Sequence, residues 1–118
     1  MFDHVTIRTQ DRAASEGFFE TVLTPLGIDK TYRTNTFSVW HDFAITVAGE
    51  DSPPTVGLHM AFPGDEDAVR RFYDNLTTAG YRANGEPGER PQYHPGYYAA
   101  YVLDPDGNNI EVVDHHRS

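Results

Sequence analysis

The alternation of hydrophobic and polar residues divides the chain into two series of short strands, each containing one helix. In the first series residues 5–7 alternate as a strand does, and apolar residues then recur every four positions from Ala14 to Val22. This spacing predicts an amphipathic helix that Asp11 can cap and that Pro25 and Gly27 end. Three further β-like runs follow, at 28–34, 36–41 and 43–48.

A polar, proline-stiffened stretch at about 49–55 precedes the second series. Residues 56–62 alternate as a strand, and acidic residues from Asp65 onward open a second apolar stripe that ends at Gly80. The pattern then predicts a strand at 81–84, a loop rich in Gly, Pro and Glu to about Gly96, and a closing hairpin. The Pro-Asp-Gly-Asn turn at 105–108 is a strong hairpin signal, because Gly and Asn accept positive φ.

The two series are copies of one unit. Asp11 and Asp65 open the two helices 54 residues apart, and residues 18–20 match residues 72–74 at the same separation. We therefore predict an α+β fold in a single domain, 1–118, with two β-α-β-β-β repeats. Repeat one covers about 1–50, the linker about 49–55 and repeat two about 56–116.

Three polar residues lie out of phase with the apolar faces of their strands. If Val5, Ile7, Leu58, Met60 and Phe62 face the helices, then His4 and His59 face the other side. Glu111 stands between apolar neighbours in the last strand, where a bare carboxylate is prohibitive unless a cation or hydrogen bond compensates it. We expect a curved mixed sheet with its helices on the outer face and an open cup that carries two histidines and one carboxylate.

Composition narrows the chemistry that such a cup can perform. The chain has no cysteine, so a metal site must use His and carboxylate ligands, which suit Fe, Mn, Ni, Co or Zn. A net charge of −9 argues against nucleic acid or an anionic membrane as a partner. No apolar run approaches the ~18 residues of a membrane span, and residues 1–4 do not resemble a signal peptide. We therefore expect a cytoplasmic protein that acts on a small molecule.

The duplicated unit, a His early in each half and the closing Asp-Pro-Asp-Gly-Asn-Asn-Ile-Glu of 104–111 resemble the vicinal oxygen chelate superfamily. This superfamily includes glyoxalase I, extradiol dioxygenases, fosfomycin-resistance transferases and bleomycin-resistance proteins. The resemblance implies that His4, His59 and Glu111 bind a divalent metal ion whose remaining positions hold two adjacent substrate oxygens. It also implies a homodimer in which His4 of one chain can meet His59 and Glu111 of the other.

The chain departs from glyoxalase I at one metal-ligand position, and the resemblance adds one candidate catalytic residue. Glyoxalase I has a fourth ligand, a carboxylate that also serves as its base, at the position that repeat symmetry assigns here to Thr46. The three-ligand pattern is closer to the dioxygenases and fosfomycin-resistance proteins. In the dioxygenases a tyrosine ten residues before the glutamate assists the chemistry, and that position is Tyr101 here.

The loop before the closing hairpin supplies the remaining candidates. His94 can act as an acid or base near neutral pH, and Tyr93 and Tyr97 can bind substrate. Arg8 shares the face of His4 and can bind an anionic substrate group. Each also has a structural alternative: His94 as an ordinary loop histidine, the tyrosines as packing residues, and Arg8 as the partner of a local acid.

These observations favour a metal-dependent enzyme but do not choose between isomerisation, C–C cleavage by oxygen and thiol addition. The rival interpretation is a non-catalytic protein that sequesters a cationic ligand, as bleomycin-resistance proteins do. The charge of −9 and the aromatic loop favour this rival, whereas the His-His-Glu set disfavours it. A third interpretation, a relative that has lost its chemistry, follows from the missing carboxylate at Thr46.

Overall fold

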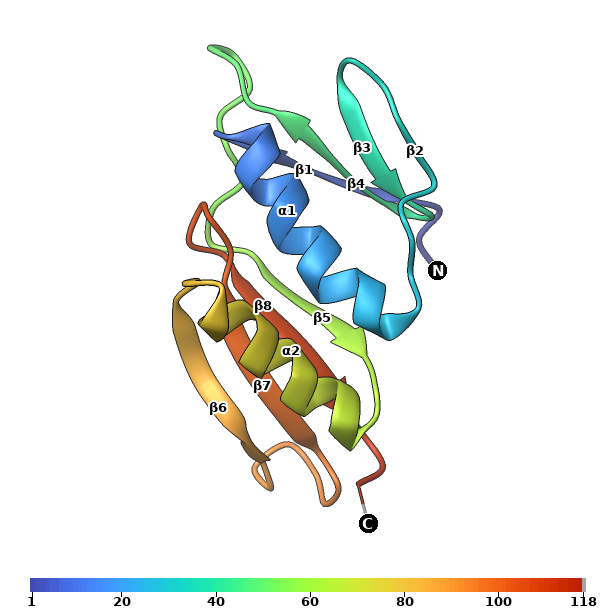
Figure 1. Cartoon of the computed structure of the whole chain (residues 1–118), viewed down its shortest axis with the longest axis vertical. Helices are drawn as coiled ribbons and strands as arrows, with labels where there is room; N and C mark the ends of the chain where they lie inside the picture. The colour runs from blue at the N-terminus through green and yellow to red at the C-terminus, as the bar shows by residue number, and fades with distance from the viewer. Residues whose placement is uncertain (118) are drawn as a thin grey trace.

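The computed structural model describes residues 1–117 and contains the predicted unit twice (Figure 1). Repeat one consists of β1 (Val5–Thr9), α1 (Arg12–Leu23), the short 3₁₀ helix η1 (Thr24–Leu26), β2 (Tyr32–Arg33), β3 (Phe37–Trp40) and β4 (Phe43–Val47). Repeat two consists of β5 (His59–Pro63), α2 (Glu66–Thr78), β6 (Ala83–Glu89), β7 (Tyr98–Leu103) and β8 (Asn109–Asp114).

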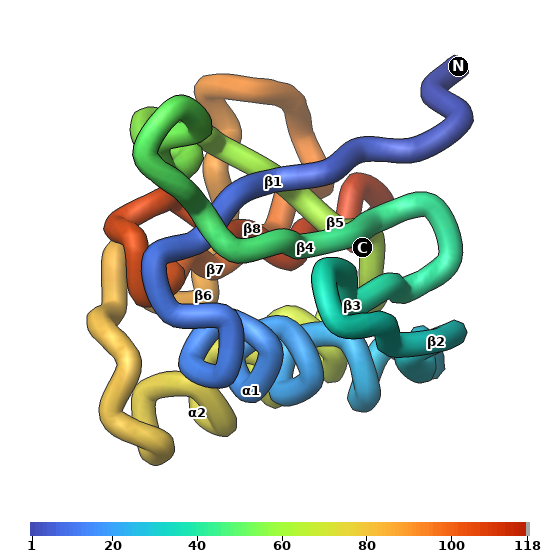
Figure 2. Tube along the Cα trace, turned by 90° about the horizontal axis from the view of Figure 1, so that it is seen from above, coloured from blue at the N-terminus to red at the C-terminus, as the bar shows by residue number. Residues whose placement is uncertain are grey.

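Each repeat forms its own four-stranded mixed sheet. The strand orders are β1-β4-β3-β2 and β5-β8-β7-β6, so the first and last strands of each repeat are parallel neighbours and the other pairs are antiparallel. Both helices lie on the same side of the strands (Figure 2). The predicted α+β class, with two repeats and open sheets, is confirmed.

Local sequence explains where both helices begin and which faces they bury. The side chains of Asp11 and Asp65 accept hydrogen bonds from the backbone N–H groups three residues on, at 3.1 and 2.8 Å, as N-cap residues do. The helices bury an apolar stripe against the sheets, comprising Phe18, Phe19, Val22 and Leu23 of α1 and Val69, Phe72 and Leu76 of α2. No helix within residues 1–117 combines the length and hydropathy that a membrane span requires.

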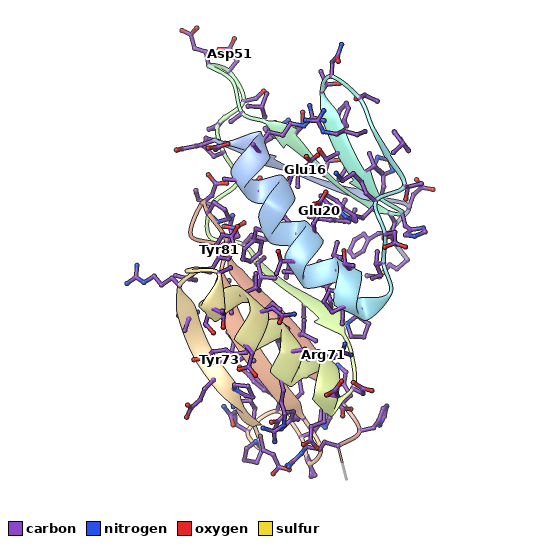
Figure 3. The ribbon with its side chains drawn as sticks, viewed as in Figure 1. Glu16, Glu20, Asp51, Arg71, Tyr73 and Tyr81 are labelled. Carbon is purple, nitrogen blue, oxygen red and sulfur yellow. The ribbon has the colours of Figure 1, made fainter. Side chains whose placement is uncertain are left out.

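The two repeats share one hydrophobic core. The rings of Phe18 and Tyr81 meet edge to face at 5.0 Å between centroids, and those of Phe43 and Phe62 at 6.0 Å. Figure 3 shows Tyr81 at the boundary between α1 and the second repeat. The helices are therefore packed within one structure rather than in two independent units.

The closing turn also joins the repeats. Oδ2 of Asp106 accepts a hydrogen bond of 2.6 Å from the buried Thr9 hydroxyl at the end of β1. Asn108 accepts from the backbone N–H of Leu58 at 3.0 Å and donates to the carbonyl of Thr55 at 2.8 Å. This turn thus holds the end of β1 and the segment before β5 in fixed positions relative to β8.

Several predicted strand bounds were wrong: β2 covers only two residues of the predicted 28–34, β5 begins at His59 rather than at 56, and β6 begins at Ala83 rather than at 81. The predicted loop from 85 to about 96 is too long, because β6 continues to Glu89. Since β6 is an edge strand with two register shifts, it tolerates Pro87 and its glycines, which a central strand would not. Val5 lies on the predicted face, since it shares that face with the buried Ile7 and pairs with the core residue Phe43, but at the start of edge strand β1 it is 36% exposed.

Candidate metal site

His59 and Glu111 meet on the face of the second sheet that is turned away from α2. They project from the parallel strands β5 and β8, where Ala61 lies opposite Glu111 in the ladder. Met60, between His59 and Ala61, packs against the core instead, which is the alternation predicted from the sequence. Nε2 of His59 lies 2.6 Å from Oε1 of Glu111.

Glu111 is 1% exposed, so each of its oxygens needs a partner. Oε1 contacts His59, and Oε2 accepts a 2.5 Å hydrogen bond from the hydroxyl of Tyr97. The carboxylate is therefore held at both oxygens by side chains from different elements. Tyr97 precedes β7 directly in sequence.

Two tyrosines around Glu111 remain protonated at neutral pH. Burial, the hydrogen bond to Glu111 and the negative charge of Glu111 raise the pKa of Tyr97 far above its ordinary value. Burial and the same charge also raise the pKa of Tyr101, which lies directly opposite Glu111 in the β7–β8 ladder, although Arg90 opposes this rise. Both phenols are thus hydrogen-bond donors, and the ring of Tyr101 lies 6.1 Å from that of His59.

A cavity of about 340 Å³ opens beside His59; it is lined by His59, Asn84, Arg90, Gln92, Tyr93, Tyr101 and Asn109. Four of these residues, Asn84, Arg90, Gln92 and Asn109, were missed from the sequence. Asn109 could have been found, because it lies two positions before Glu111 and therefore shares its face. Arg90 comes from the loop after β6, and its guanidinium lies 5.2 Å from the centre of the Tyr101 ring.

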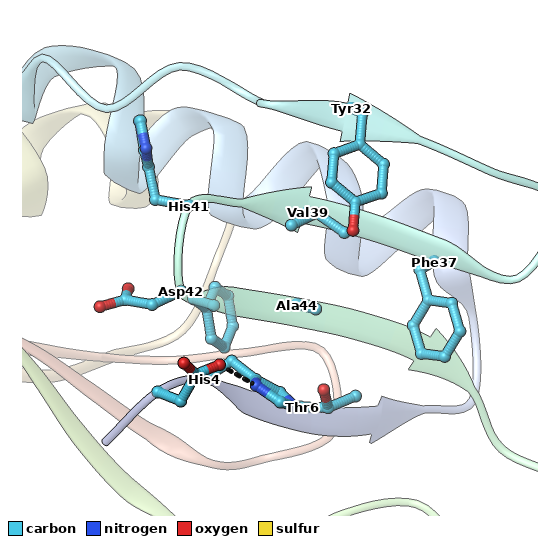
Figure 4. A pocket seen from close by; sticks show the side chains of 10 residues that line it. His4, Thr6, Tyr32, Phe37, Val39, His41, Asp42 and Ala44 are labelled. Carbon is cyan, nitrogen blue, oxygen red and sulfur yellow. Dashed lines mark hydrogen bonds and ion pairs between the residues drawn. The ribbon is translucent and has the colours of Figure 1, made fainter. Parts of the chain in front are cut away.

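His4 lies elsewhere, in a cavity of about 670 Å³ on the first sheet (Figure 4). Its Nδ1 is 2.7 Å from a carboxylate oxygen of Asp3, and its side chain is 70% exposed. The structure brings His59 and Glu111 together but does not bring His4 to them within one chain. Among residues 1–117, no cluster of three or more His, Asp or Glu residues is arranged to hold a metal ion.

The remaining candidates fall inside and outside the cavity beside His59. Tyr93 and Tyr101 line it, whereas His94 does not. His94 instead contacts Nδ1 of His115 at 3.0 Å and the carbonyl of Pro95 at 2.8 Å. Arg8 is exposed on β1 and lines neither cavity, so the structure does not place it beside the His59–Glu111 pair.

The first repeat has no equivalent of Glu111. Arg8 and Thr46 pair in the β1–β4 ladder as Ala61 and Glu111 pair in the β5–β8 ladder. The hydroxyl of Thr46 donates a 2.6 Å hydrogen bond to the carbonyl of Thr36 and is thereby committed to the β3–β4 hairpin. The two repeats therefore differ chemically at this position, where one has a hydroxyl and the other a carboxylate.

The His59–Glu111 pair fits a divalent metal ion in part. One imidazole nitrogen and one carboxylate oxygen converge, and this donor set suits Fe, Mn, Co, Ni or Zn. Tyr97 orients the carboxylate through its other oxygen, as outer hydrogen-bond partners do for metal ligands. Two protein ligands are one fewer than the three that catalytic zinc sites use, so the pair is incomplete by itself.

Comparisons with known proteins agree with this architecture. The chain is similar over 99% of its length to a glyoxalase/bleomycin resistance protein from Albidiferax ferrireducens T118, with 27% identity, a TM-score of 0.83 and 99% of that chain covered. It is similar in fold to the fosfomycin resistance protein FosX from Mesorhizobium loti, with 19% identity, a TM-score of 0.68, and 97% and 91% of the two chains covered.

A 60-residue stretch is 47% identical to part of the highly reducing polyketide synthase NEC1 from Pyricularia oryzae (strain 70-15 / ATCC MYA-4617 / FGSC 8958). This match covers 50% of the chain and only 2% of the synthase. The family model of the Glyoxalase/Bleomycin resistance protein/Dioxygenase superfamily matches residues 1–112. The chain belongs to this superfamily.

Proposed function

We propose that the protein is a divalent-metal-dependent enzyme that acts on a small molecule bound through adjacent oxygens. The observation that carries this proposal is the pairing of His59 with the buried carboxylate of Glu111 at 2.6 Å, beside an open cavity. A structural salt bridge does not need an open cavity next to it, whereas a metal that binds substrate does. The superfamily membership supports the same interpretation.

We further propose that the third ligand is His4 of a second copy of the chain. One copy brings only two ligands together, and His4 lies on the equivalent exposed face of the other repeat. The strands β1 and β5 are edge strands, so each can lie against another chain. Large apolar side chains on the first sheet are also exposed, including Tyr32 at 58%, Phe37 at 39% and Val47 at 51%. A two-fold dimer would pair the first sheet of each copy with the second sheet of the other and form two identical sites.

The residues around the pair have distinct roles in this proposal. A metal held by His59, Glu111 and the second copy's His4 would supply Lewis-acid polarisation of a substrate oxygen. Tyr101, kept protonated by its raised pKa, donates a hydrogen bond to developing negative charge on the substrate. Arg90 adds positive charge to the same cavity, and the amides of Asn84 and Asn109, joined at 3.1 Å, bind neutral polar groups.

Metal content tests the proposal directly. We expect the protein purified without chelator to hold close to one divalent ion per chain, and His59→Ala and Glu111→Ala to lose it. His41→Asn is a matched control, because His41 lines the same cavity as His4 and Asn tolerates its φ of 53°. A wild type that neither retains nor takes up any of Fe, Mn, Co, Ni or Zn would disprove the metal proposal.

The second candidate function is sequestration of a cationic ligand without catalysis. The cavity around His4 favours it, because Tyr32, Phe37 and Phe43 line this cavity together with the carboxylates of Asp3 and Asp42. Neither Lys nor Arg lines it. A cationic glycopeptide should then raise the melting temperature of metal-free protein through preferential binding to the native state. An unchanged melting temperature at saturating ligand would eliminate this candidate.

A further inference from the structure

We propose that the segment 115–117, which follows β8, positions Tyr97 and through it the carboxylate of Glu111. Residues 115–117 neither line the cavity beside His59 nor contact Glu111. Two experiments test the inference, and one of them, a measurement of metal affinity, rests on the proposed function.

Aromatic rings from two segments of the chain surround the ring of Tyr97. Its ring is enclosed by three others, with centroid distances of 4.8 Å to Tyr93, 5.3 Å to His94 and 5.1 Å to His115. Tyr93 and His94 belong to the same loop as Tyr97, whereas His115 comes from the segment after β8. This segment thus supplies one wall of the space in which the Tyr97 ring lies.

The segment is attached to the loop by two hydrogen bonds. Nδ1 of His115 lies 3.0 Å from Nε2 of His94, and the backbone N–H of Arg117 donates to the carbonyl of Gly96 at 3.1 Å. The carbonyl oxygen of Pro95 can only accept a hydrogen bond, so Nδ1 of His94, which contacts it, carries a hydrogen. In the neutral ring Nε2 of His94 is then free to accept from His115.

Gly96 makes this close approach possible. Its φ of +87° favours glycine, and a Cβ there would lie 3.2 Å from the carbonyl oxygen of His115 and 3.3 Å from that of Arg117. The loop and the segment after β8 are therefore in backbone contact at the residue directly before Tyr97. Movement of the segment would be transmitted to Tyr97 through one peptide unit.

Arg117 anchors the segment to the rest of repeat two. Its Nε and Nη1 lie 2.8 Å from carboxylate oxygens of Glu66 on α2 and Glu89 at the end of β6. Its guanidinium also lies 4.5 Å from the centre of the Tyr98 ring, at the start of β7. Arg117 therefore connects three elements and holds the segment against the loop, which makes it a positioning residue for Tyr97.

The first test needs no metal. The hydroxyl proton that Tyr97 donates to a buried carboxylate should give a downfield proton resonance, identified by its absence in Tyr97→Phe. We expect Arg117→Ala to broaden or abolish this resonance. Arg71→Ala, which breaks an exposed ion pair with Asp67 on α2, should leave it unchanged. A resonance that is unaltered in Arg117→Ala would overturn the inference.

The second test is a double-mutant cycle on metal affinity. Loss of an outer hydrogen-bond partner of a metal ligand lowers affinity ~10–100-fold, which is the range expected for Tyr97→Phe. Arg117→Ala should weaken binding by no more than this factor and should have no further effect in the Tyr97→Phe background. Multiplicative effects of the two changes, or wild-type affinity in Arg117→Ala, would overturn the inference. If the wild type binds no metal, the proposed function fails and the proton resonance alone decides.

Discussion

The hydroxyl of Tyr97 offers a quantitative test of how the buried carboxyl group of Glu111 is stabilised inside the protein. Tyr97→Phe deletes the donor to Oε2 of a carboxylate that is 1% exposed, and it removes little volume. A hydrogen bond to a charged group contributes ~1.5–3 kcal/mol, so we expect the free energy of unfolding of the metal-free protein to fall by ~2 kcal/mol. With ~2.1 cal/mol/K of unfolding entropy per residue, a chain of 118 residues should melt ~8 °C lower.

Urea denaturation at neutral pH in the presence of a chelator measures this difference. Tyr93→Phe is the matched control, because Tyr93 is 60% exposed and its ring packs 4.8 Å from that of Tyr97. We expect the control to unfold within ~0.5 kcal/mol of the wild type, as surface substitutions do. Equal stabilities of Tyr97→Phe and Tyr93→Phe would refute the idea that the Tyr97 hydroxyl stabilises the buried Glu111 carboxyl group.

Two further predictions concern a cluster of charges in the first repeat and the turn that joins the repeats. Burial raises the pKa of Glu16 on α1 (Figure 3), but hydrogen bonds from Ser38 and Arg33 and the charge of Lys30 outweigh it and lower the pKa below 4.5. A lowered pKa means that ionised Glu16 stabilises the folded protein above pH 4.5 and that this contribution is lost as pH falls through the lowered pKa. Glu16→Gln should therefore make the free energy of unfolding, measured with urea, fall less steeply as the pH is lowered. Wild-type steepness in the variant would contradict this. Asp106→Ala removes acceptors for Thr9 and for the backbone N–H of residue 10, and it should cost ~1–3 kcal/mol by the same assay. A cost equal to that of Asp51→Ala, at the exposed tip of the linker, would show that the turn does not join the repeats.

Local sequence predicted the parts of the fold that depend on local physics. Asp11 and Asp65 cap their helices, because a carboxylate three residues before an unpaired backbone N–H satisfies it wherever the helix lies. Strand alternation also predicted that His59 and Glu111 lie on the same side of the sheet, whereas the parallel pairing of β5 with β8, which brings them together, is a feature of the structure that element order does not determine.

Other features depend on contacts between distant segments. The sequence placed His4 and His59 on corresponding faces, but the relative position of the two repeats arises from their shared core and from the turn around Asp106. His115 carries no pattern that indicates a contact with His94, and β6 extends through glycine and proline because it is an edge strand. Each of these features is determined by tertiary packing, which hydrophobic periodicity along the chain does not reveal.

The central claim is that two copies of the chain share each metal site, and complementation between variants tests it most directly. His4→Ala and His59→Ala chains carrying different tags are combined, and the mixed dimer is isolated with both tags. We predict that neither variant binds metal by itself and that the mixed dimer binds about half of the wild-type amount, because one of its two sites keeps both histidines. A His4→Ala protein with the metal content of the wild type, or a mixed dimer that binds no more metal than either single variant, would contradict the claim.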